Sequence, residues 1–147
     1  MSRLGDNRCD PYLKRAHQLS HAGSGWPGED RWWTWLTTTI NRYSPDRCPY
    51  AAAPDEPMDA GATLTMSLPW LPRIRSLGVP AAFVTQDGSE AVGLIPWART
   101  DVLFIGGSTE WKLDPSAWSV ARQAVDRGIP VHMGRVNSRA ACNWPRI

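Results

Sequence analysis

The feature that most constrains the fold is a series of short, continuously apolar runs that alternate with stretches of helical character. The runs lie at 48–53, 80–85, 101–105 and 129–133. They lack the polar/apolar alternation of strands with one solvated face, so both faces of their sheet are expected to be buried. No hairpin signal joins one run to the next. The sequence therefore predicts an α/β fold with a parallel sheet covered by helices.

The first strong helix signal lies at residues 29–43. Trp32, Leu36 and Ile40 recur there at a spacing that places them on one face of a helix, after an acidic first turn. The tryptophans of this segment are interpreted as core packing rather than as a platform for a ligand. The segment is therefore expected to be an amphipathic helix.

Two further helical segments separate the apolar runs. Residues 59–77 have a helical pattern that Pro69 and Pro72 must kink or split. Residues 114–127 carry the clearest pattern, with Asp114 as the capping residue and a proline at the first helical position. The expected apolar face of this helix consists of Ala117, Val120, Ala121, Ala124 and Val125.

The length of the chain limits the size of the fold. At 147 residues it is long enough for one domain. A complete eight-fold (β/α) barrel needs about 250 residues. We expect a partial (β/α) barrel-like sheet of about four βα units at 29–139. A loosely ordered segment is expected at 1–28, and an irregular tail at 140–147.

Composition excludes several classes of protein. A formal net charge of +2 is too balanced to indicate nucleic-acid binding by itself. The three cysteines have neither zinc-ligand spacing nor the pattern of a disulfide framework, so no metal is expected. No apolar run has the length of a membrane span, and the start lacks a signal-peptide core. A cytoplasmic protein without a cofactor or a membrane partner is expected.

Polar residues and glycines follow each predicted strand. In parallel α/β folds ligands bind at the carboxyl ends of the strands, so these residues are candidates for a binding site. Taken singly, each also has a structural explanation as a helix cap or a turn residue; as a set they favour a site. The candidates are Asp55, Gln86, Asp87, Gly106, Gly107, Gly134, Arg135 and Asn137.

The chemistry of this set suits a nucleobase on a sugar-phosphate chain. A carboxylate at Asp55 can accept from two N–H donors of a purine, and the Gln86 amide both donates and accepts. Paired glycines allow close approach of backbone N–H groups to a carbonyl or phosphate. Arg135 can hold a phosphate. His132, inside the last predicted strand, is interpreted as a core histidine without a catalytic role.

The segments around these residues resemble the tRNA-guanine transglycosylase superfamily. The segments are AAPDEPMDAGATLTMSLPWLPRIRSLGVPAAFVTQDG, DVLFIGGSTEWKL and VHMGRVNS, and the resemblance covers roughly residues 48–139. It is closest to the short phage and bacterial branch that inserts 7-deazapurines into DNA. Such proteins are (β/α)8 barrels that exchange guanine for a modified base through a covalent intermediate, as the queuine tRNA-ribosyltransferases do.

The resemblance implies roles for individual residues. Asp55 matches the aspartate that recognises the base, and Gln86 matches the glutamine that contacts it. The Gly106–Gly107 pair matches the glycines whose backbone faces the base. Gly134 and Arg135 fall in the segment near the backbone phosphate.

The sequence departs from the family after the last predicted strand. The family has a further strand there with a nucleophilic aspartate, whereas this sequence contains no Asp or Glu after Asp126. The catalytic residue is therefore unassigned. We expect a truncated, frameshifted or split form that keeps the pocket for guanine or a 7-deazaguanine in DNA or tRNA.

Two other hypotheses remain at this point. The chain could be a non-catalytic module that binds nucleic acid or completes a barrel with a second copy or a second chain, because a partial barrel exposes sheet edges. It could also be an unrelated α/β enzyme that acts on a phosphorylated metabolite.

Overall fold

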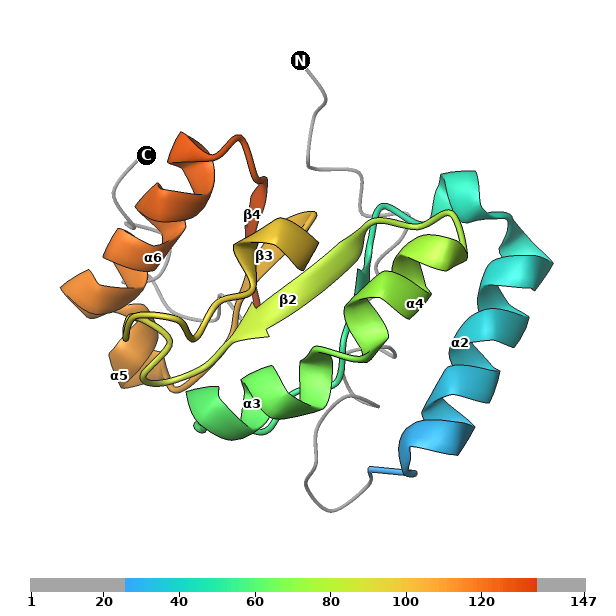
Figure 1. Ribbon diagram of the computed structural model, residues 1–147, viewed down its shortest axis with the longest axis horizontal. Helices are drawn as coiled ribbons and strands as arrows, with labels where there is room; N and C mark the ends of the chain where they lie inside the picture. Colours follow the sequence, from blue (N-terminus) through green and yellow to red (C-terminus); the bar gives the residue numbers. More distant parts are fainter. Residues whose placement is uncertain (1–25, 135–147) are drawn as a thin grey trace.

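A four-stranded parallel sheet forms the centre of the protein. The computed structural model describes residues 26–134 (Figure 1). The strands follow one another across the sheet in chain order, β1-β2-β3-β4, and the predicted parallel α/β fold is confirmed. The strands are β1 (Ala51–Ala52), β2 (Ala81–Thr85), β3 (Val102–Ile105) and β4 (Val131–Met133).

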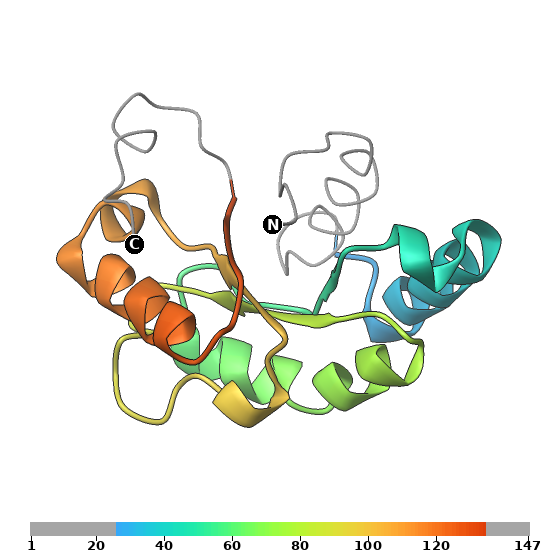
Figure 2. The same cartoon turned by 90° about the horizontal axis from the view of Figure 1, so that it is seen from above.

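Helices connect successive strands and form a layer beside the sheet. In Figure 2 the α3 and α4 helices lie along one face of the sheet, and α6 flanks it beside β4. None of the helices within residues 26–134 is long and apolar enough to cross a membrane. The helical elements are α2 (Glu29–Tyr43), η2 (Pro45–Arg47), α3 (Ala60–Ser67), α4 (Trp70–Ser76), η3 (Trp97–Arg99), α5 (Thr109–Lys112) and α6 (Pro115–Asp126).

Side chains on both faces of β1, β2 and β3 are buried, as the continuous apolar runs predicted, whereas those of β4 are partly or fully exposed. Successive strand residues point to opposite faces, so Phe83 packs toward the helices while its neighbours Ala82 and Val84 face the other way. The helix-side cluster also contains Leu103 and Ile105. The second cluster consists of Tyr50, Ala52, Ala82, Val84, Val102 and Phe104.

The predicted helix at 29–43 is confirmed, and its tryptophans pack as expected. Trp32 is fully buried, and its ring meets Trp70 of α4 edge-on at 5.1 Å between centroids. Trp33 is half-buried beside the same Trp70 ring, at 5.3 Å. The Arg73 guanidinium stacks on both Trp33 and Trp70, at 4.7 and 4.3 Å from their centroids. Aromatic packing therefore fixes α2 against α4.

The predicted helix at 59–77 is split in two, as its prolines required. The α3 helix begins at the Asp59 cap, whose side chain accepts from the Ala62 N–H at 2.9 Å. Pro69 has no N–H to continue the α3 ladder, so a new helix starts there. Pro72 lies in the first turn of that helix, where a missing N–H costs no intrahelical bond.

Three features of the structure differ from the sequence predictions. Val125 of α6 is 43% exposed and lies outside the apolar face predicted for it. The run at 48–53 forms a strand only at Ala51–Ala52. The short α5 helix was not predicted, because the segment was interpreted only as a glycine turn with binding residues. Apart from residues 26–28, the segments at 1–28 and 140–147 lie outside the described residues.

His132 is not the buried core histidine that was predicted. It is exposed on β4, with its ring beside those of Phe104 and Tyr50 at centroid distances of 5.1 and 5.7 Å. The reason is its place on the last described strand of the sheet, which pairs with β3 alone. Partial burial against these rings lowers the pKa of the imidazole.

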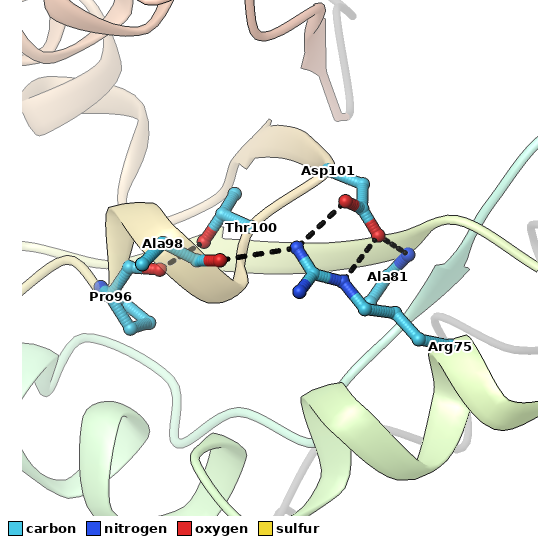
Figure 3. Close-up of polar contacts among 6 residues, drawn as sticks. All are labelled: Arg75, Ala81, Pro96, Ala98, Thr100 and Asp101. Carbon is cyan, nitrogen blue, oxygen red and sulfur yellow. Dashed lines mark hydrogen bonds and ion pairs between the residues drawn. The ribbon is translucent and has the colours of Figure 1, made fainter.

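An ion pair fastens the amino-terminal edge of the sheet. Arg75 of α4 donates through Nε and Nη2 to the two Asp101 carboxylate oxygens, at 2.9 and 2.8 Å (Figure 3). The same Asp101 carboxylate accepts from the Ala81 N–H at 2.9 Å, and Arg75 also donates to the Ala98 carbonyl at 3.3 Å. The pair therefore joins α4 to the starts of β2 and β3.

Replacing Trp32 with alanine should destabilise the fold by about 3–5 kcal/mol, because it leaves a large cavity between α2 and α4. Urea unfolding followed by fluorescence and circular dichroism measures the change. Val92→Ala is the control, since Val92 is 103% exposed and its loss should cost less than about 0.5 kcal/mol. A cost for Trp32→Ala no larger than the control's would contradict this packing.

Replacing Asp101 with asparagine should cost about 1 kcal/mol near neutral pH, because the pair is only partly shielded from solvent. Partial burial alone would raise the pKa of Asp101, but hydrogen bonds from Arg75 and the Ala81 N–H lower it overall. The stabilisation is therefore present above the unfolded-state pKa of about 3.9 and is lost as pH falls through the lower folded-state pKa.

The measurement is the difference in unfolding free energy between the wild type and Asp101→Asn as a function of pH. The difference should shrink in acid. Asp126→Asn, in the exposed Arg122–Asp126 pair of α6, serves as the matched control and should have little effect at any pH. A constant difference for Asp101→Asn down to about pH 2 would refute the assignment.

Candidate functional site at the carboxyl ends of the strands

Asp55 and Gln86 meet in the interior, just beyond the ends of β1 and β2. The Gln86 Nε2 donates to Asp55 Oδ2 at 2.6 Å. Asp55 is fully buried and Gln86 is 2% exposed. The parallel register of β1 and β2 brings together these residues, which are far apart in the sequence. The structure thus joins the two residues for which the sequence predicted the most direct contact with a base.

The Gln86 amide is fixed at both ends. While its nitrogen donates to Asp55, its Oε1 accepts from the Met58 N–H at 2.9 Å. Its backbone N–H donates to Ser89 Oγ at 2.9 Å. The amide orientation is therefore determined by the chain, and the amide donates toward Asp55.

Asp87 is held by the segment that follows β3. Its Oδ1 accepts from the Ser108 N–H at 2.7 Å, and its Oδ2 accepts from Ser108 Oγ at 2.6 Å. Ser108 also caps α5 by accepting from the Trp111 N–H at 3.1 Å. Asp87 therefore connects the loop after β2 to the start of α5.

Gly106 is required by the close packing of this edge. A Cβ at this position would lie 2.7 Å from the Thr85 carbonyl oxygen, 2.8 Å from Val84 Cγ1 and 3.1 Å from Gln86 Nε2. Its N–H donates to the Thr85 carbonyl at 3.1 Å. The sequence predicted that the backbone N–H groups of both glycines face a ligand; in this structure the Gly106 N–H is engaged within the chain.

Gly107 is required for a different reason. Its φ of +85° lies in the left-handed region, and a Cβ there would come within 2.6 Å of Asp87 Oδ1. This conformation lets the chain turn from β3 into α5 while Ser108 stays on Asp87. The pair Gly106–Gly107 thus shapes the edge around Gln86 and Asp87.

Lys112 is a buried cation at the same edge that the sequence analysis did not single out. It lies on α5, is 7% exposed, and its Nζ donates to the Gly134 carbonyl at 2.9 Å. Gly134, a predicted site residue, is itself buried at the end of β4, where its N–H donates to the Ile105 carbonyl. Only the position of Lys112 within the FIGGSTEWKL segment could have indicated a role at this edge. Neither its charge nor the hydrophobic periodicity predicts that this lysine is buried.

The structure brings together the predicted residues Asp55, Gln86, Asp87, Gly106 and Gly107, while Gly134 lies at the end of the neighbouring strand β4. The remaining predictions, Arg135 and Asn137, lie outside the described residues. Among residues 26–134 no group of three or more His, Cys, Asp or Glu side chains could hold a metal ion.

The Asp55 carboxylate and the Gln86 amide are hydrogen-bonding groups with fixed orientations at the carboxyl-terminal edge of the sheet. A carboxylate oriented by an amide can receive N–H donors, and the buried environment strengthens each such bond. A buried carboxylate is costly to maintain without compensating contacts. The position of this buried polar pair, beyond the carboxyl ends of parallel strands, is the one at which folds of this kind bind ligands.

Comparison with known proteins adds no family assignment: no protein-family model matches the chain, and neither the curated proteins nor the solved structures contain a match.

Replacing Gly106 with alanine should destabilise the protein by about 1–3 kcal/mol and displace the Gln86 amide, because the new methyl group overlaps Thr85, Val84 and Gln86. Urea unfolding measures the first effect, and the NMR shifts of the Gln86 side-chain NH2 measure the second. Gly61→Ala is the matched control. Gly61 lies on α3, where a Cβ would make only an ordinary contact with Asp59 Oδ1 at 3.7 Å, so alanine should stabilise by up to about 1 kcal/mol. An unmoved Gln86 resonance in the Gly106 variant would argue against the packing described.

Proposed function

We propose that the carboxyl-terminal edge of the sheet binds guanine or a 7-deazaguanine, as in the base-exchange proteins that the sequence resembles. The observation that carries this proposal is the contact between the fully buried Asp55 carboxylate and the Gln86 amide, at 2.6 Å. The pair lies where ligands bind in parallel α/β folds, outside the carboxyl ends of the strands.

The hydrogen-bonding pattern of the pair suits guanine. Guanine carries an N–H and an amino group side by side on one edge, and a carboxylate can accept from both. Adenine lacks this pair of adjacent donors. Gln86 orients the Asp55 carboxylate, and its amide is itself held by the Met58 N–H. A preformed acceptor favours the ligand because less ordering is needed on binding.

Access to the pair requires movement of the chain around Met58, between Asp55 and the Asp59 cap of α3. Asp55 and Gln86 are almost completely buried, and the Met58 N–H occupies Gln86 Oε1. Met58 itself is 65% exposed and has a φ of +62°, an uncommon conformation for a residue with a side chain. We therefore expect the base to enter as this segment shifts away from Gln86.

The reaction proposed for the site is exchange of guanine in DNA or tRNA for a 7-deazaguanine. Such exchange needs a nucleophile that holds the sugar while the base is replaced. The chemistry proposed for Asp55 and Gln86 is recognition of the base, and they are not assigned as that nucleophile. The exchange step is therefore the part of the proposal that depends most on a further residue or chain.

A second candidate function is a non-catalytic module that binds nucleic acid or completes a barrel with another chain. The observation in its favour is the open sheet. Within the described residues, β1 pairs only with β2, and β4 pairs only with β3. These two outer strands therefore each have one side whose backbone groups are not paired with another strand. Light scattering of the purified protein tests this function: a defined dimer or larger assembly would support barrel completion.

Guanine and 7-deazaguanine should bind the full-length protein in isothermal titration calorimetry, with adenine at least tenfold weaker. Asp55→Asn should abolish the binding, because it replaces one acceptor oxygen with a donor. Asp126→Asn removes an exposed carboxylate of α6 and should leave the affinity unchanged. Circular dichroism establishes that each variant is folded.

Two outcomes separate the parts of this proposal. Absence of purine binding by folded wild-type protein would overturn the proposed site. Purine binding without incorporation of labelled guanine into DNA or tRNA would retain the site and favour the non-catalytic module.

A further inference from the structure

A cavity of about 560 Å³ lies at the amino-terminal edge of the sheet, opposite the edge that carries Asp55 and Gln86. This volume is in the range of pockets that hold small molecules. The lining comes from the starts of the strands and from the turn between α4 and β2. No residue of this lining belongs to the candidate site described above.

Most of the wall is apolar and offers few backbone hydrogen bonds. Prolines precede β1, β2 and β4 in this lining, and they have no N–H to donate. The carbonyls of Pro80 and Pro130 already accept from the N–H groups of Ala51 and Leu103, at 2.9 Å each. A ligand therefore meets rings and methyl groups over most of its surface. The apolar wall consists of Pro49, Val79, Pro80, Val102, Pro130 and Val131.

The charged groups in the wall cancel one another. Arg75 and Asp101 both line the cavity, and they bind each other through two hydrogen bonds (Figure 3). The Asp101 carboxylate is further occupied by the Ala81 N–H, so neither charge is left to be neutralised by a ligand. A charged ligand would lose its hydration here without gaining an opposite charge.

The aromatic groups in the wall are uncharged near neutral pH. Burial, with a smaller effect of Cys48, raises the pKa of the Tyr50 phenol above its usual range. Partial burial lowers the pKa of His132. Their rings lie 5.7 Å apart, and no hydrogen bond of either side chain is found within the described part of the chain. The exposed His132 imidazole thus offers one donor and one acceptor to a ligand.

We propose that this amino-terminal cavity binds a small, neutral, planar ring compound with a polar edge. The His132 imidazole forms the hydrogen bond to that edge, and the proline and valine side chains enclose the ring. An aromatic amide or an uncharged nitrogen heterocycle has the required chemistry. Its flat faces suit contact with the apolar proline side chains and with the Tyr50 and His132 rings, which are tilted relative to each other.

The test compares three probes of nearly equal size: neutral benzamide, anionic benzoate and cationic benzamidine. Each is titrated into the full-length protein and followed by two-dimensional amide NMR at neutral pH. Benzamide should shift the amide signals of Val79, Val102 and His132, with an affinity at least tenfold higher than that of either ion. Equal affinities for the three probes would overturn the proposal, as would shifts spread over the whole surface.

Two variants locate the binding. Val131→Trp places a large side chain in the wall and should weaken benzamide binding at least tenfold. Val92→Trp adds the same side chain at an exposed loop position far from the lining and should have no effect. His132→Phe keeps a ring in place but removes the hydrogen bond, and should weaken benzamide more than benzene. Retention of benzamide binding in both Val131→Trp and His132→Phe would place the ligand elsewhere.

The result is independent of the proposed function. Val131 lines the amino-terminal cavity and packs against the helix-side core, but it touches no residue of the Asp55–Gln86 pair, so guanine binding by the folded Val131→Trp variant should remain as in the wild type. Conversely, Asp55→Asn should leave benzamide binding unchanged. Loss of both ligands in one folded variant would contradict the existence of two separate sites.

Discussion

Parallel pairing of the strands in chain order is the constraint on which the rest of the structure depends. Because all the strands run in the same direction, their carboxyl ends lie together at one edge of the sheet and their amino ends lie together at the opposite edge. The contact between Asp55 and Gln86 exists only because β1 and β2 end side by side. The same constraint gathers the prolines that precede the strands at the opposite edge. The two edges thereby acquire different chemistry: fixed polar groups lie at one, and a mainly apolar wall with one internally paired arginine and aspartate lies at the other.

The sequence was most informative where local chemistry has few alternatives. Pro69 had to interrupt a helix, Asp114 with Pro115 had to begin one, and the structure places these boundaries accordingly. The apolar runs predicted a sheet buried on both faces. The helix-side cluster around Phe83 and the second cluster around Val84 confirm this for β1, β2 and β3. The grouping of Asp55 with Gln86 followed from the rule that parallel strands share an exit edge.

What could not be predicted depends on contacts between distant segments. Lys112 is buried with its Nζ on the carbonyl of Gly134, a residue 22 positions away, and His132 is exposed on the last strand of the described sheet. The need for a glycine at position 106 also has a different cause from the one predicted. The glycine pair indicated close approach of a ligand to the backbone, whereas a side chain at this position would collide with the Thr85 carbonyl and crowd the Gln86 amide.

The contact between the Met58 N–H and Gln86 Oε1 has a consequence for molecular discrimination. An amide side chain can turn over and exchange its donor for its acceptor, which would invert the preference of any edge it presents. Here a backbone donor holds one end and a carboxylate holds the other, so the reversed amide would face two mismatches at once. The polarity of the closed site is therefore set by the backbone. Because entry of a base requires the Met58 N–H to leave Gln86 Oε1, the amide can turn over only after that contact is broken, and the Asp55 carboxylate then still favours the orientation in which the amide donates.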